Sequence, residues 1–149
     1  MEKKNIPSMV FLIDFDGTCT THNFPHVGKE IGAVPVLKRL VASGHKLILF
    51  TMRSDNTNKT ISADPVIKAV NGKFLTDAVN WFKSHDIPLW GVQKNPFQHT
   101  WTDSPKAFGD YMIDDIAIGT PLIHNTSISK QPFVDWVKME VMLENMGLI

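Results

Sequence analysis

Two carboxylates that lie two residues apart, Asp14 and Asp16, are the most reactive feature of the sequence. They directly follow an apolar stretch, residues 11–13, and Gly17 and Thr18 come next. In an extended strand, residues i and i+2 point to the same face, so both carboxylates are expected to emerge together where the strand ends. Like charges this close favour a cation or a shared proton between them. Magnesium prefers oxygen ligands, and beside it one Asp can attack a phosphoryl group while the other transfers protons.

A hydroxyl follows a second apolar stretch. Thr51 comes directly after residues 46–50, which have the pattern of a buried strand, and Met52 and Arg53 follow it. The Thr51 hydroxyl and the backbone N–H groups after it are suited to hold phosphate oxygens. The alternative for Thr51 is a strand residue with no chemical role. Arg53 has two interpretations, a bidentate contact with a phosphate or an ion pair at the surface.

An acidic pair, Asp114 and Asp115, closes a third apolar stretch, residues 111–113. Adjacent aspartates are ordinary on a solvated turn. At the end of an apolar run they oppose burial unless they serve a site. The position of this pair therefore favours a functional site over a surface turn.

The sequence of residues 11–18, Phe-Leu-Ile-Asp-Phe-Asp-Gly-Thr, resembles the first signature of the haloacid dehalogenase superfamily, Asp-x-Asp-x-Thr after the first strand. Thr51 and the acidic pair resemble the second and fourth signatures and follow in the same order. The third signature is a lysine. Lys106 resembles it because it lies eight residues before the acidic pair, and Lys94 is the alternative. The resemblance covers nearly the whole chain.

This resemblance implies a magnesium-dependent phosphatase. In that chemistry Asp14 attacks phosphorus and forms an aspartyl-phosphate, while Asp16 protonates the leaving oxygen and then activates water. Magnesium is held by the Asp14 carboxylate, the Asp16 carbonyl and Asp114, with Asp115 acting through water or by orienting its neighbours. Thr51 and the lysine hold the charge of the transferring group. Two aspartates in the first signature argue against the dehalogenase branch.

The gaps between the signatures are too short for a large cap domain. Residues 19–45 hold a loop and one helix, and residues 54–105 hold a loop, one helix and a strand, so the resemblance points to a capless member. Such a site needs another cover, either a second copy of the chain or a loop such as residues 20–26. Thr18 and His22 are expected at the substrate in this arrangement. The alternative for His22 is a solvated loop histidine.

The apolar patterns predict strands that alternate with helices. The expected strands are residues 9–13, 46–50, 89–92 and 111–113, and the expected helices are residues 35–43, 65–70, 73–85 and 132–145. Their buried faces are expected to include Val36, Leu37, Leu40 and Val41; Leu75, Val79 and Phe82; and Phe133, Trp136, Val137 and Met139. This order predicts an α/β three-layer sandwich with a central, mostly parallel sheet, Rossmann-like and without a large cap. The three signatures then meet at the carboxyl ends of the strands, where open sheets bind ligands.

Composition sets the broad class. The 149 residues are expected to form one domain, and a hydrophobic content of 43% with 20% charged residues is typical of globular proteins. There is no formal net charge, so no overall field attracts nucleic acid or an anionic membrane, although a local basic patch stays open. The single cysteine, Cys19, suits a reducing cytoplasm, and no apolar run approaches the roughly 20 residues of a membrane span. We expect a cytoplasmic protein.

The nature of the substrate stays open. A nucleotide or a polynucleotide end, a sugar phosphate, and phosphoryl transfer to a hydroxyl acceptor all suit the same motifs, as does a non-catalytic phosphate-binding or regulatory protein. A response-regulator receiver domain also combines Asp, Mg²⁺, Thr or Ser and Lys in an α/β fold. Its acidic pair belongs to the first strand, however, whereas here the pair comes last.

Overall fold

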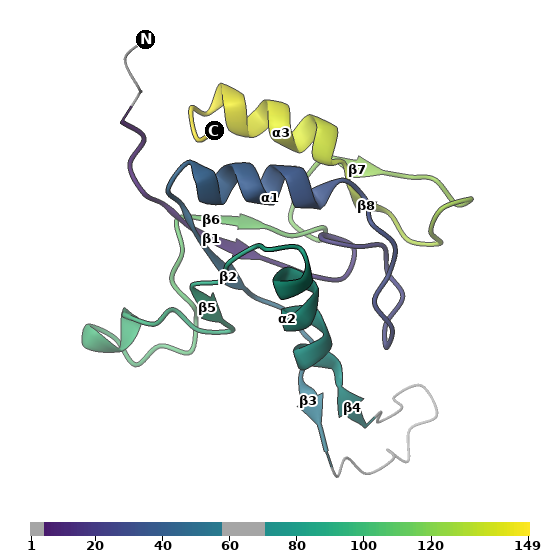
Figure 1. The fold of residues 1–149 in the computed structure, drawn as a ribbon, viewed down its shortest axis with the longest axis horizontal. Coiled ribbons are helices and arrows are strands. Elements are labelled where there is room, and N and C mark those ends of the chain that lie inside the picture. Colours follow the sequence, from purple (N-terminus) through teal and green to yellow (C-terminus); the bar gives the residue numbers. More distant parts are fainter. Residues whose placement is uncertain (1–4, 58–70) are drawn as a thin grey trace.

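A four-stranded parallel sheet forms the centre of the protein (Figure 1). The computed structural model describes residues 5–57 and 71–149. The strand order is β5-β2-β1-β6, with β1 at Val10–Ile13, β2 at Lys46–Leu49, β5 at Gly91–Val92 and β6 at Tyr111–Ile113. The predicted α/β class, the parallel sheet and the lack of a large cap are confirmed.

The two central strands are apolar on both faces, which suits a sheet that is covered on both sides. In register, Phe11 lies beside Leu47 and Leu12 beside Ile48. Phe11 and Leu47 belong to the main hydrophobic core, whereas Leu12 and Ile48 pack with Ala107 in a smaller cluster on the opposite face. The sheet therefore lies between two apolar layers.

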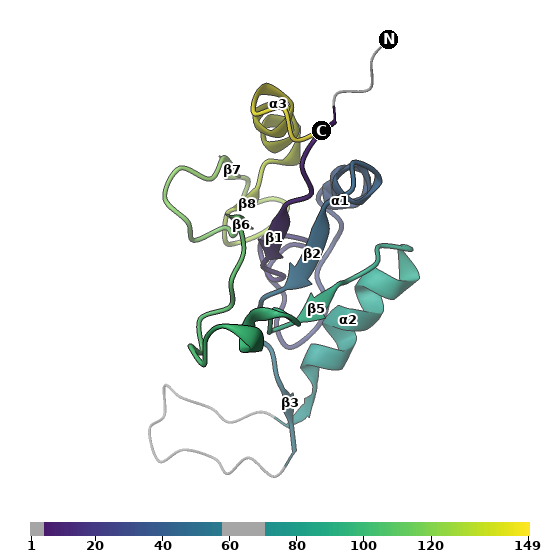
Figure 2. The ribbon, with the colours of Figure 1, turned by 90° about the vertical axis from the view of Figure 1, so that its left-hand side faces the viewer.

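Helices provide the layer over the main core. They are α1 (Ala33–Ala42), α2 (Phe74–Ser84) and α3 (Trp136–Asn145). Figures 1 and 2 show α1 and α3 side by side, with α2 farther along the same side of the sheet. The opposite face is covered by the irregular segment before β6, which contains the 3₁₀ helix η1 (Gln98–Thr100).

Two short antiparallel ladders complete the structure. One pairs β3 (Asp55–Asn56) with β4 (Gly72–Lys73), and the other pairs β7 (Leu122–Ile123) with β8 (Phe133–Val134). The helix expected at residues 65–70 lies outside the described residues. No helix in the described part of the chain is long and apolar enough to cross a bilayer.

The prediction for the last helix is wrong at its start. Residues 132–135 were expected to be its first turn, but Phe133–Val134 form strand β8 and the helix begins at Trp136. Tertiary backbone bonds outweigh the helix-starting tendency of Pro132, because the Val134 N–H donates to the Gly17 carbonyl. The Asp135 side chain then caps the helix by accepting from the Lys138 N–H.

The buried helix faces differ from the predicted ones at a few positions. Val137 is 78% exposed, although it was expected on or beside the buried side of the last helix. In α2 the buried residues are Phe74, Ala78, Trp81 and Phe82, while Leu75 and Val79 are only partly buried. The expected strand at residues 89–92 is reduced to Gly91–Val92.

Candidate active site

Three carboxylates meet at the carboxyl ends of β1 and β6. Asp14 follows β1, Asp114 and Asp115 follow β6, and the Asp14 N–H donates to the Ile113 carbonyl at 3.0 Å. One ligand oxygen from each carboxylate lies within 4.8 Å of the other two. Parallel pairing of the two strands causes this convergence, because it places both strand ends at one edge of the sheet.

The Thr18 hydroxyl connects two of these aspartates, Asp14 and Asp115, by hydrogen bonds. It donates to Asp14 Oδ2 at 2.7 Å and accepts from the Asp115 N–H at 3.0 Å. Thr18 was expected at the substrate, but its side chain is fully buried. The structure therefore corrects that expectation: Thr18 orients two aspartates instead of facing a ligand.

The turn after β1 requires a glycine. Gly17 has φ +78°, and a Cβ at this position would lie 2.1 Å from His22 Nε2 and 2.6 Å from Asp115 Oδ2. The space is needed because His22 Nε2 lies 2.9 Å from Asp115 Oδ2. His22 is thus not a free loop histidine; it contacts the carboxylate cluster and keeps about a quarter of its side chain exposed.

The carboxylates strongly disfavour full ionisation. Burial raises the pKa of Asp14 from 3.8 to about 8, opposed by the Thr18 hydrogen bond and reinforced by the nearby charge of Asp114. Burial and the neighbouring Asp115 also raise the pKa of Asp114. A cation beside these oxygens would relieve the repulsion. An all-oxygen donor set of this kind fits Mg²⁺.

The Asp16 carboxylate pairs with Arg53 and does not belong to the cluster of Asp14, Asp114 and Asp115, whereas the spacing of Asp14 and Asp16 predicts that both carboxylates face one cation. Strand β1 ends at Ile13, so the alternation of an extended strand does not continue to Asp16. Its carboxylate forms a bidentate ion pair with Arg53, with Nε–Oδ2 and Nη2–Oδ1 distances of 2.8 Å. Only the backbone carbonyl of Asp16 is left for the predicted role in metal binding.

Arg53 is one of the most buried residues, with only 2% of its surface exposed, so the predicted alternative of a surface ion pair is wrong. Besides the two bonds to Asp16, its guanidinium donates to the backbone carbonyls of Pro25, His26 and Phe74. These contacts use all five of its N–H donors. The predicted contact of Arg53 with a phosphate would therefore require it to give up an existing bond.

The loop after β2 is held by Gln93, a residue that no sequence motif singles out. Gln93, at the end of β5, accepts from the Thr51 N–H and donates to the Thr51 and Arg53 carbonyls. The Thr51 hydroxyl accepts from the Arg53 N–H at 3.1 Å. The Met52 side chain is almost fully exposed, and its N–H makes no hydrogen bond with the described residues. Within the described part of the chain, this N–H and the Thr51 O–H are donors of the predicted phosphate loop that make no hydrogen bond.

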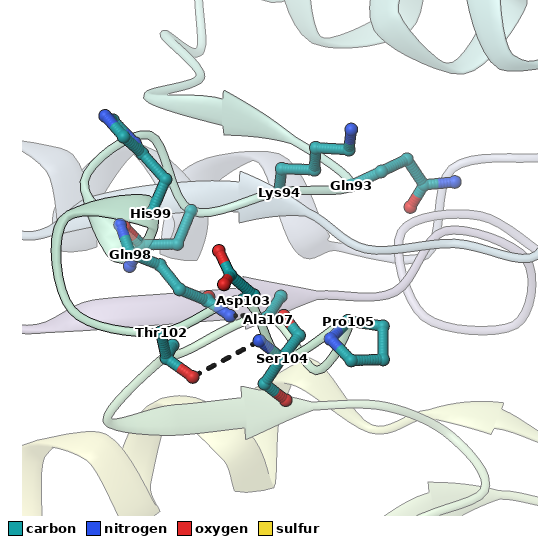
Figure 3. Close-up of a pocket in the computed structure, with 10 residues that line it drawn as sticks. Gln93, Lys94, Gln98, His99, Thr102, Asp103, Ser104, Pro105 and Ala107 are labelled. Atoms are coloured by element: carbon teal, nitrogen blue, oxygen red, sulfur yellow. Dashed lines mark hydrogen bonds between the residues drawn. The ribbon is translucent and has the colours of Figure 1, made fainter.

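The two candidate lysines lie beside neighbouring cavities. Lys94 lines a cavity of about 420 Å³, and Figure 3 shows it with Gln93 on one side, across from Asp103 and Ser104. Lys106 lines an adjoining cavity of about 410 Å³. Neither amino group makes a hydrogen bond or ion pair within the described part of the chain. The choice between them stays a prediction.

The C-terminal segment supports the turn after β1. The Trp136 indole N–H donates to the Thr18 carbonyl at 2.7 Å, and both residues are buried. The Cys19 thiol, which is buried in the core, donates to the Asp14 carbonyl. Trp136 lies 118 residues from Thr18 in the sequence, so local sequence patterns could not predict this contact.

A scan against protein-family models and a search of curated proteins both found no match to this chain. Among solved structures, it is similar to a conserved protein coded by a locus of Bacteroides thetaiotaomicron. The two chains are 26% identical, and the match covers 94% of this chain and 93% of the other with a TM-score of 0.67. The likeness concerns the α/β fold over nearly its full length.

Replacing Arg53 by Met should lower the free energy of unfolding by about 3 kcal/mol, because it leaves the Asp16 carboxylate without its buried partner. The matched control is Arg39→Met, since Arg39 forms ion pairs with Glu140 and Glu144 at the surface and its replacement should change the free energy of unfolding much less. Urea denaturation measures both. Equal effects of the two substitutions would contradict the structural role given to Arg53.

Asp14 should make the metal-free protein less stable as the pH rises. Because its pKa is raised from 3.8 to about 8, the folded state holds a proton that the unfolded chain loses within that window. The free energy of unfolding therefore falls as pH increases from about 4 to about 8. Thermal unfolding in EDTA should show this slope in the wild type and a weaker one in Asp14→Asn. Identical slopes would refute the assignment.

Proposed function

We propose that this chain is a magnesium-dependent phosphohydrolase of the haloacid dehalogenase type, acting on phosphate monoesters through an aspartyl-phosphate on Asp14. The observation that carries the proposal is the convergence of Asp14, Asp114 and Asp115, whose ligand oxygens lie within 4.8 Å of one another. The resemblance of the sequence motifs to that superfamily supports it, and so does the matching order of the motifs along the chain.

Asp14, Asp114 and Asp115 are the residues that would hold Mg²⁺, together with the backbone carbonyl of Asp16. When bound, the ion supplies positive charge that favours the ionised Asp14 carboxylate and offsets the negative charge of the phosphoryl oxygens. This fits a site in which burial and neighbouring charge raise the pKa of Asp14 to about 8.

The proposed reaction has two displacements at phosphorus. An Asp14 carboxylate oxygen forms a bond to phosphorus while the bond to the leaving oxygen breaks, and Asp16, which has taken up a proton beforehand, gives that proton to the leaving oxygen. Water then attacks phosphorus, Asp16 accepts its proton, and the bond between phosphorus and the Asp14 oxygen breaks to release inorganic phosphate. The geometry leaves room for these proton transfers, since Asp16 keeps 19% of its side chain exposed.

Arg53 has a positioning role in this scheme. It holds both Asp16 oxygens at 2.8 Å, and its guanidinium lies over the rings of Phe15 and Phe24 at 4.9 and 5.3 Å from their centroids. A carboxylate has about four lone-pair positions. Two of these accept from Arg53, so the remaining ones are available for proton transfer in a fixed orientation.

The transferring phosphoryl group is proposed to lie between Asp14 and the loop after β2. There the Thr51 hydroxyl and the open Met52 N–H provide donors, and a lysine provides a further positive charge. We also propose a cytoplasmic location, because the single cysteine, Cys19, is buried and free.

The first test is release of 4-nitrophenol from 4-nitrophenyl phosphate with Mg²⁺ or with EDTA. We expect release that depends on Mg²⁺ and a fall in kcat of at least about 1000-fold in Asp14→Asn, because the nucleophile is lost. Asp77→Asn is the matched control, since this exposed carboxylate on α2 lies outside the carboxylate cluster. Substantial activity of a folded Asp14→Asn protein would refute the nucleophile assignment.

A second prediction separates the two lysines. Replacing the lysine that holds the transferring phosphoryl group by Ala should lower kcat/KM about 100-fold. Replacing the other lysine should lower it less than about threefold. We expect the large loss in Lys106→Ala and the small one in Lys94→Ala. The reverse order would assign the role to Lys94, and two small losses would exclude both residues.

A further inference from the structure

We infer that a cavity beside the carboxylate cluster binds the leaving group of the substrate, and that this leaving group carries a second phosphate. The inference rests on the proposed function. The cavity has a volume of about 570 Å³, within the ordinary range for small-molecule sites. Its lining includes His22, Phe24, Lys29, Ser129, Lys130 and Gln131.

The cavity shares a wall with the carboxylate cluster. His22 lines it, and the Nε2 atom of the same side chain lies 2.9 Å from Asp115 Oδ2. A phosphate ester whose phosphoryl group lies at Asp14 and whose leaving group extends past His22 would place that leaving group in the cavity.

The charge of the lining favours an anion. Lys29 and Lys130 come from two separate segments, and none of the described residues that line the cavity is a carboxylate. Neither amino group has an ion pair or hydrogen bond with any residue that the structure describes. The chain as a whole has no net charge, so two unpaired cations at one cavity are a local feature. Phosphate is a natural partner for such a pair.

The loop that carries Lys29 is fixed at its base. The Lys29 N–H donates to the Thr21 hydroxyl at 2.9 Å, and the Thr21 N–H donates to the Lys29 carbonyl at 3.0 Å. Close approach of the two loop arms requires Gly28, because a Cβ there would lie 2.0 Å from the Thr21 carbonyl oxygen. These bonds hold the backbone of Lys29 in one position at the cavity.

Other lining residues provide polar and apolar groups. The Ser129 hydroxyl is buried and has no hydrogen-bond partner in the described part of the chain. Ser129 lines the cavity, and an unsatisfied buried hydroxyl is costly to the fold. Phe24 and Ile128 are 52% and 44% exposed and provide apolar surface for a ring. A phosphorylated nucleoside or sugar combines such a ring with a second phosphate.

The test compares substrates that differ in the charge of the leaving group. The nucleotide pair is adenosine 5′-monophosphate and adenosine 3′,5′-bisphosphate, and the sugar pair is fructose 6-phosphate and fructose 1,6-bisphosphate. These pairs distinguish the two sources of a second phosphate, and 4-nitrophenyl phosphate reports the chemistry alone. In the wild type with Mg²⁺ we expect at least one bisphosphate to have a kcat/KM at least about tenfold above its monophosphate.

The variants Lys29→Met and Lys130→Met test whether the cavity causes the preference for a bisphosphate. Each should raise KM for the favoured bisphosphate about tenfold and leave kcat/KM for 4-nitrophenyl phosphate within about twofold of the wild type. Lys138→Met is the matched control, because Lys138 is exposed on α3 and does not line the cavity. It should change neither value.

Two results would count against different claims. If the wild type hydrolyses 4-nitrophenyl phosphate but has no preference for either bisphosphate, or if the lysine variants affect all substrates equally, the leaving-group inference is overturned. If the wild type with Mg²⁺ hydrolyses none of the five compounds, the proposed function itself fails.

Discussion

The rest of the site depends on one electrostatic constraint, the cost of placing four aspartates at one edge of a sheet. The structure offsets only part of this cost. Arg53 neutralises Asp16, whereas Asp14, Asp114 and Asp115 stay together; the Thr18 hydroxyl bonds to Asp14, and His22 contacts Asp115. Burial accordingly raises the pKa of Asp14 to about 8. The negative charge of these three aspartates is not fully compensated by the described residues, so a bound cation is the simplest way to neutralise it.

The ion pair of Arg53 and Asp16 connects the chemistry to the surrounding loops. The guanidinium donates to carbonyls at Pro25 and His26 in the loop after β1 and at Phe74 at the start of α2. A change in Asp16 would therefore alter the loop that also provides Lys29. Under the proposed function, one buried cation orients the proton-transferring carboxylate and also holds the loop over the substrate.

The sequence predicted the features that are encoded locally. Strands β1, β2 and β6 were recognisable because each is a short apolar run, and their parallel pairing places the motifs at one edge. The pairing of Asp16 with Arg53 was not predictable, because the partners are 37 residues apart and the alternation of a strand suggested a shared cation instead. The start of α3 was missed for a similar reason, since backbone bonds from distant segments decide it.

A site without a large cap has to select its substrate with loops. Here the loop of residues 20–30 and the connection between β7 and β8 form the cavity next to the carboxylates, and both are anchored by backbone bonds rather than by an inserted domain. These loops leave part of the cavity wall exposed, since Phe24 is 52% and Ile128 44% exposed. If the proposed function is correct, the leaving group must complete the enclosure. Fast turnover then requires a substrate that fills the cavity, so selectivity and water exclusion come from the same contacts.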